Sequence, residues 1–121
     1  IDDNSFDEIE DASIDFFWSF GVLCHANPDL LRTILANSLA KLRPGAMAAH
    51  QYCDWQKLEQ YGWERGGVPV EFKEKPDLEI WWPRNDRESM AQMARDLGWH
   101  VVVADAGLVR RDGLIILQRP A

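Results

Sequence analysis

The chain has few of the residues that mark several common classes of protein. Its 121 residues include two cysteines, Cys24 and Cys53. These are too few for a disulfide scaffold, so we predict reduced thiols in a cytoplasmic protein. Its 20 acidic residues outnumber its 13 lysines and arginines, which argues against a nucleic-acid partner. The apolar runs are far shorter than the roughly 18 residues of a membrane span, so no membrane partner is predicted.

Two kinds of binding motif are also missing from the sequence. The three histidines have no ligand spacing such as H-x-x-x-H, so no metal site is predicted. The eight glycines include no G-x-G-x-x-G that follows a strand and opens a helix. The stretch GWERGG at 62–67 follows no predicted strand. A complete glycine-rich cofactor loop is therefore not expected in this chain.

What is present indicates one α/β domain over residues 1–121. Asn27 and Pro28 suit the start of a helix, and Asn85 with Glu88 has the spacing of a capping box before a second helix. Pro44 and Gly45 are expected to end the first helix. The patterns predict, in order, a strand at 14–20, a helix at 28–43, a strand at 46–54, a helix at 86–97, and strands at 99–104 and 114–118.

Residues 54–84 have no steady period and are rich in aromatic side chains. We predict one short helix near 55–61 and an extended piece near 68–73. A connection of this length usually has a function, so we interpret it as an insert or lid that can form a pocket wall.

This order of elements implies a mostly parallel sheet covered by helices, with only the last strand antiparallel. The apolar run at 14–20 is then a core strand with helices on both faces. Ligands of open α/β sheets bind outside the carboxyl ends of the strands. The polar turn that follows residue 20 is therefore the expected site.

Three motifs together resemble the second half of a class I S-adenosylmethionine-dependent methyltransferase. They are ASIDFFWSFGVLCH, LAKLRPGAMAAH and DLGWHVVVAD…RDGLIILQRP. The resemblance implies a partial Rossmann-like doubly wound sheet, with strands equivalent to 4-5-7-6 of that fold and the last one antiparallel. It also implies that the chain is a C-terminal part of such a domain, since the family's glycine-rich cofactor loop is missing.

The resemblance implies S-adenosyl-L-methionine as cofactor and methyl transfer to oxygen or nitrogen of a small-molecule acceptor. We expect this chain to be inactive alone. One alternative is half of another doubly wound enzyme, such as a nicotinamide-dependent reductase, although no Tyr-x-x-x-Lys is present. Another is a non-catalytic interaction module derived from a methyltransferase.

The expected cofactor contacts come from the resemblance and from the strand end. Asn4 and Ser5 correspond to a turn that contacts adenine in the family. The other expected contacts lie at the carboxyl end of the 14–20 strand, where Gly21 lets a ligand approach the backbone; they are Ser19, Phe20, Gly21 and His25.

Three residues are candidates for proton transfer. His25 is a candidate general base because the histidine side chain can accept a proton near neutral pH, although a structural histidine is the commoner case. His50 is on the neighbouring strand, and Asp54 follows it, where an exposed loop aspartate is the plainer interpretation. Four aromatic residues are expected either to line an acceptor pocket or to cap the core: Tyr52, Trp55, Trp81 and Trp82.

The 14–20 strand is also expected to be an open edge of the sheet, because the family's neighbouring strand is not in this chain. Its unpaired backbone groups lie among Phe16, Phe17, Trp18 and Phe20. Such an edge favours pairing with another chain. We therefore predict a homodimer through the 14–20 edge.

Overall fold

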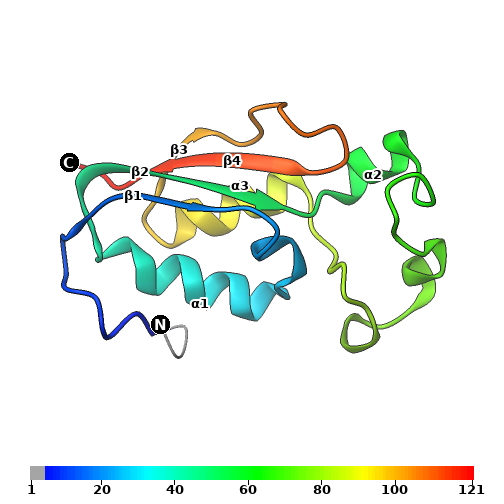
Figure 1. Cartoon of the computed structure of the whole chain (residues 1–121), viewed down its shortest axis with the longest axis horizontal. Coiled ribbons are helices and arrows are strands. Elements are labelled where there is room, and N and C mark those ends of the chain that lie inside the picture. The colour runs from blue at the N-terminus through cyan, green and yellow to red at the C-terminus, as the bar shows by residue number, and fades with distance from the viewer. Residues whose placement is uncertain (1–4) are drawn as a thin grey trace.

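The computed structural model describes residues 5–121 and alternates strands with helices along the chain (Figure 1). Short 3₁₀ helices lie at Leu23–His25, Val70–Glu74 and Asp77–Glu79. No helix in the described part is long and apolar enough to cross a membrane. The main elements are β1 (Ile14–Ser19), α1 (Pro28–Leu39), β2 (Leu42–Tyr52), α2 (Trp55–Tyr61), α3 (Arg87–Asp96), β3 (His100–Val103) and β4 (Gly113–Gln118).

The four strands form one sheet in the order β1-β2-β4-β3. β1 runs parallel to β2, whereas β4 pairs antiparallel with both β2 and β3. β4 is thus the last strand in the chain but lies inside the sheet. This arrangement confirms the predicted α/β class and the 4-5-7-6 strand order.

The first helix begins as predicted but ends earlier. The side chain of Asn27 accepts a hydrogen bond from the Leu30 N–H (2.9 Å), and Pro28 occupies the first turn. The helix ends at Leu39 rather than near residue 43, and β2 already begins at Leu42. Backbone bonds cause this difference, because the Gly45 N–H donates to the Arg119 carbonyl (2.9 Å). Gly45 accommodates the path with a φ of 84°.

Two local predictions were wrong. The cap of α3 is Asp86, not Asn85, because the Asp86 carboxylate accepts from the Ser89 N–H (2.8 Å). Asn85 instead accepts from the Asp86 N–H. The piece near 68–73, predicted as extended, contains the 3₁₀ helix Val70–Glu74, which buries Phe72.

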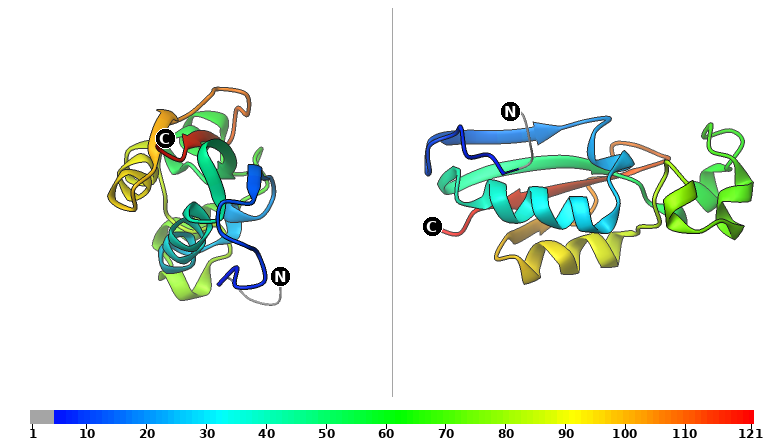
Figure 2. Two further views of the ribbon diagram at one scale, coloured as in Figure 1. Left: turned by 90° about the vertical axis from the view of Figure 1, so that its left-hand side faces the viewer. Right: turned by 90° about the horizontal axis from the view of Figure 1, so that it is seen from below.

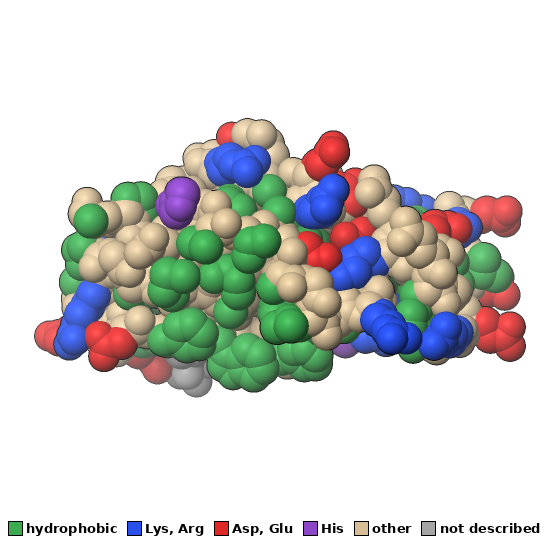
Figure 3. All heavy atoms as spheres, turned by 90° about the horizontal axis from the view of Figure 1, so that it is seen from above, with side chains coloured by type: hydrophobic (Ala, Val, Ile, Leu, Met, Phe, Trp, Pro, Cys, Tyr) green, Lys and Arg blue, Asp and Glu red, His purple; other side chains and the backbone are tan. Residues whose placement is uncertain are grey.

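Both long helices, α1 and α3, lie on the same face of the sheet (Figure 2). The expectation that β1 has helices on both faces is therefore wrong for the described chain. The covered face holds the main core, which includes Leu23, Leu31, Leu35, Leu42, Ala48, Met90, Ile115 and Leu117. On the open face, Phe16 and Trp18 of β1 are each 57% exposed, and apolar side chains gather there (Figure 3).

Residues 54–84 extend beyond the carboxyl ends of β1 and β2 (Figure 1). They form a second, smaller core at that end of the molecule, and Cys24 and Cys53 join it from the main sheet region. Its members are Cys24, Cys53, Leu58, Trp63, Val68, Phe72, Ile80 and Trp82, with Trp55 packed against them. The aromatic-rich segment therefore lies next to the sheet edge at which ligands of such folds bind.

Candidate functional site

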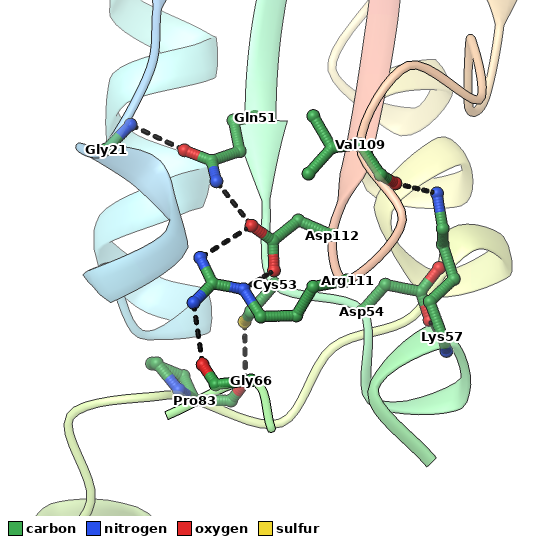
Figure 4. A network of polar contacts seen from close by, with 10 residues as sticks. All are labelled: Gly21, Gln51, Cys53, Asp54, Lys57, Gly66, Pro83, Val109, Arg111 and Asp112. Carbon is green, nitrogen blue, oxygen red and sulfur yellow. Dashed lines mark hydrogen bonds and ion pairs between the residues drawn. The ribbon is translucent and has the colours of Figure 1, made fainter. Parts of the chain in front are cut away.

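Three polar residues, Gln51, Arg111 and Asp112, connect the carboxyl ends of β1 and β2 to the start of β4 (Figure 4). The Gly21 N–H, just after β1, donates to Oε1 of Gln51 near the end of β2 (2.5 Å). Nε2 of Gln51 donates to Oδ2 of Asp112, the residue before β4 (2.5 Å). Gln51 and Asp112 are both buried. One amide side chain thus fixes the relative positions of three chain segments.

Arg111 neutralises the buried carboxylate of Asp112. Its Nε and Nη2 donate to the two carboxylate oxygens, each at 2.8 Å. Its Nη1 donates to the carbonyl of Gly66 (2.8 Å), and its guanidinium lies 4.6 Å from the ring centre of Trp82. The hydrogen bonds to Asp112 raise the pKa of Arg111. The ion pair therefore also attaches segment 54–84 to the sheet.

A second ion pair fixes α2 against the loop between β3 and β4. Nζ of Lys57 donates to Asp105 (2.7 Å) and to the carbonyl of Val109 (2.6 Å). Burial opposes ionisation of Asp105, but the bonds from Lys57 and from the N–H groups of Gly107 and Leu114 prevail and lower its pKa. The loop before β4 is thus fixed twice, by Lys57 through Asp105 and Val109 and by the network of Gln51 and Asp112.

Of the predicted cofactor contacts, Phe20, Gly21 and His25 lie at the carboxyl end of β1 and are exposed. Gly21 has a φ of 77°, and no atom lies within 4 Å of the position that a Cβ would take. Ser19 is buried beneath them. Ser5 lies in a turn before β1, where its hydroxyl accepts from the Asp7 N–H (3.2 Å). Asn4 lies outside the described residues.

The three candidates for proton transfer have different surroundings. Nδ1 of His25 lies 3.0 Å from the Trp81 carbonyl, which can only accept, so the proton is on Nδ1 and Nε2 is free to accept one. His50 is fully buried, and its Nδ1 contacts Oγ of Ser19 (2.7 Å). Asp54 is buried as the cap of α2. Burial raises the pKa of Asp54 against the opposing effect of the N–H donors of Lys57 and Gln56.

The four predicted acceptor-pocket aromatics divide into buried and accessible groups. Tyr52 and Trp82 are buried, and the Tyr52 hydroxyl donates to the carbonyl of Ala104 (2.8 Å). Trp55 is half-buried, and its Nε1 donates to the carbonyl of Trp82 (3.2 Å). Trp81 is 49% exposed beside His25. Trp81 is the member of this set with the largest surface available to a ligand.

The cysteines lie beneath the site as inert thiols. Cys53 is buried, and its Sγ donates to the carbonyl of Pro83 (2.7 Å). Burial raises the pKa of both Cys24 and Cys53, so neither is a thiolate nucleophile at neutral pH. No group of three or more His, Cys, Asp or Glu side chains in residues 5–121 is placed to hold a metal ion.

The network residues Gln51, Arg111 and Asp112 were not among the residues singled out from the sequence. One signal was available, because a glutamine inside a buried strand needs a polar partner. That partner is 61 positions away in the chain, and spacing alone does not identify it.

We predict that His50 makes the protein less stable in mild acid. Burial lowers the pKa of His50 to about 4, whereas an unfolded histidine titrates near 6.5. Between these values the unfolded chain binds a proton that the folded chain does not. The free energy of unfolding should therefore fall by about 2 kcal/mol from this group between pH 7.5 and pH 5.

Urea unfolding at both pH values, followed by tryptophan fluorescence, measures this effect. His50→Asn keeps a polar atom for Ser19 but has no titrating ring. The other titrating groups contribute equally to the pH dependence of both proteins. The free energy of unfolding should therefore fall less in acid for the variant than for the wild type. An identical pH dependence in the two proteins would show that His50 is not the cause.

Comparison with known proteins places the fold. No model of a known protein family matches the sequence, and no curated protein matches it. Solved structures do match it, and three of them are each 15% identical to this chain. The first is a chain from the complex between the Haloferax volcanii Trm112 methyltransferase activator and a methyltransferase, with a TM-score of 0.64. The second is a SAM-dependent methyltransferase from Methanosarcina mazei, with a TM-score of 0.62. The third is the Burkholderia thailandensis 1,6-didemethyltoxoflavin-N1-methyltransferase with bound 1,6-didemethyltoxoflavin and S-adenosylhomocysteine, with a TM-score of 0.63.

These matches cover nearly all of this chain but only part of the others. They include 98%, 98% and 93% of the present residues, and 60%, 65% and 46% of the respective matched chains. The chain thus spans less than two thirds of the length of each of these three structures. It has the Rossmann-like α/β fold seen in S-adenosylmethionine-dependent methyltransferases.

Proposed function

We propose that the chain takes part in methyl transfer from S-adenosyl-L-methionine to an oxygen or nitrogen atom of a small molecule. The observation that carries the proposal is the sheet itself, with antiparallel β4 between β2 and β3. The matched methyltransferases share this fold over at least 93% of the chain. The exposed strand-end residues lie where an open α/β sheet binds its ligand.

The residues at the end of β1 fit part of such a cofactor. Gly21 leaves open space beside the backbone, and the Phe20 ring next to it is exposed enough to pack on a ligand. Phe20 and Gly21 would therefore contact S-adenosylmethionine, which supplies an electrophilic methyl group when bound. The described residues include no glycine-rich turn between a strand and a helix, so the fit is limited to one side of the cofactor.

His25 is the residue best suited to accept a proton from the acceptor. Its Nδ1 is held by the Trp81 carbonyl, which leaves the lone pair on Nε2 available. The exposed ring packs edge-on to Trp82, at 5.4 Å between ring centres. His50 is buried within the sheet and Asp54 caps a helix, so neither has a free path to an acceptor. The proposal therefore assigns the proton to His25.

We further propose that the chain forms the carboxyl-terminal part of a larger methyltransferase unit, with segment 54–84 as a wall or lid over the site. Support comes from the bare, apolar open face of the sheet and from the partial coverage of the matched structures. Removing apolar surface from water is favourable by roughly 25 cal/mol per Å². Covering this face with further polypeptide would therefore stabilise the protein.

Cofactor titration tests the proposed function. We expect the complete reading frame that encodes these residues to bind S-adenosylmethionine in isothermal titration calorimetry, and residues 1–121 alone to bind it weakly or not at all. In the complete protein Gly21→Ala should weaken binding about tenfold or more, because a side chain would occupy the ligand's space.

Gly45→Ala is the matched control. Gly45 also has a positive φ of 84° and open space around it, so its substitution strains the backbone equally, but it lies at the start of β2, away from the site. It should bind the cofactor like the wild type. If the complete protein does not bind the cofactor, or if Gly45→Ala weakens binding as much as Gly21→Ala does, the proposal is wrong.

Residues 1–121 alone should form a homodimer through the 14–20 edge. Among residues 5–121, β1 pairs on one side only, and Phe16 and Trp18 of β1 and the adjacent Phe20 are exposed. Light scattering at tens of micromolar should give twice the chain mass. Trp18→Lys should lower the measured mass toward that of the monomer. Trp81→Lys, at a similarly exposed tryptophan in segment 54–84, should leave the measured mass unchanged. A monomeric wild type would contradict this prediction.

A further inference from the structure

An open pocket of about 310 Å³ lies at the carboxyl end of β2. It is bordered by the end of β1, the loop before β4 and residues 61–66 of segment 54–84. Its floor contains Gln51 and Asp112, whose positions are fixed by the network described above. Its remaining lining residues are Phe20, Tyr61, Arg65, Gly66, Val109, Arg110 and Arg111.

The pocket carries an excess of positive charge. The charge of Arg111 is compensated by Asp112. Arg65 and Arg110 are exposed, and the guanidinium of neither forms a hydrogen bond or an ion pair with any residue in the range 5–121. Two uncompensated guanidinium groups therefore border one small pocket. The chain as a whole has a net charge of −7, so this concentration of cations is local.

One side of the pocket offers an aromatic surface to a ligand. The Phe20 ring is exposed at one side. At the other, the guanidinium of Arg65 lies 4.4 Å from the ring centre of Tyr61, which restrains the arginine while its N–H groups remain free to donate. A guanidinium presents donors in a planar fork that matches carboxylate and phosphate oxygens.

We propose that this pocket binds the oxyanion of a small aromatic acid or phosphate ester through Arg65 and Arg110, and that this ligand is the methyl acceptor. The second part rests on the proposed function. Phe20 connects the two sites, since it lines the pocket and directly precedes Gly21. The acidic surface elsewhere disfavours long polyanions, which is consistent with a small ligand.

Binding of defined probes to the complete protein tests the inference without the cofactor. The probes are 4-hydroxybenzoate, phenyl phosphate and the neutral 4-hydroxybenzamide. We expect at least one anion to bind about tenfold or more tightly than the amide, because charge-assisted hydrogen bonds are lost with the neutral group. The preferred anion identifies the oxyanion as carboxylate or phosphate.

Variants and side-chain NMR identify the residues involved. Arg65→Gln and Arg110→Gln should each weaken anion binding about tenfold, while Arg95→Gln, an exposed arginine of α3, should not. In wild-type protein labelled with ¹⁵N, the Nε–H signals of Arg65 and Arg110 should shift on titration, and that of Arg95 should not.

The inference is overturned if the anions and the amide bind equally, or if Arg95→Gln has the same effect as the pocket variants. This failure is distinct from failure of the proposed function. If the protein binds the cofactor but does not prefer the anions to the amide, only the proposal of an acidic methyl acceptor is rejected. Anion binding at Arg65 and Arg110 without cofactor binding retains the anion pocket and rejects its assignment to methyl transfer.

Discussion

The carboxyl edge of the sheet depends on the burial of one charge, the carboxylate of Asp112. A buried carboxylate is costly unless it is paired and hydrogen-bonded. Here Arg111 binds both of its oxygens and Gln51 binds one of them. The same two partners reach Gly66 and Gly21. Satisfying this single group therefore fixes the end of β1, the end of β2, the start of β4 and segment 54–84 relative to one another.

The hydrogen bonds of Asp112 lie between the two apolar cores of the molecule. The covered face of the sheet is a conventional apolar core between the strands and helices α1 and α3. The second core lies beyond the strand ends and supports the aromatic segment. Between them lie the exposed groups Phe20, Gly21 and His25, together with the arginine-lined pocket. A ligand at this position would lie against Gln51 and Asp112, whose side chains are buried and hydrogen-bonded to each other.

Much of the fold could be predicted from the sequence, because helix caps and short helices depend on neighbouring residues and the three motifs are each contained in a short stretch. The Asn27 cap and the helix of 55–61 follow from neighbouring residues, and the strand order followed from the resemblance. The end of α1 did not follow, since the Gly45 N–H donates to the carbonyl of Arg119, far along the chain, and this bond commits the residues before it to β2.

The surroundings of the candidate site residues were harder to predict for the same reason. The strand-end residues Phe20, Gly21 and His25 could be placed from the position of a strand end alone. The burial of His50 depends on which face of the sheet carries helices. The pairing of Gln51 with Asp112 depends on β4 lying beside β2, which spacing along the chain does not reveal.

We propose that the carboxyl ends of β1 and β2 form the ligand site of a methyltransferase unit. A crystal structure of the complete protein with S-adenosylhomocysteine tests it most directly. The account predicts that the ligand contacts Phe20 and the open side of the Gly21 backbone, with the arginine pocket adjacent. A ligand bound at the amino ends of the strands, or against the helices of the covered face, would contradict it.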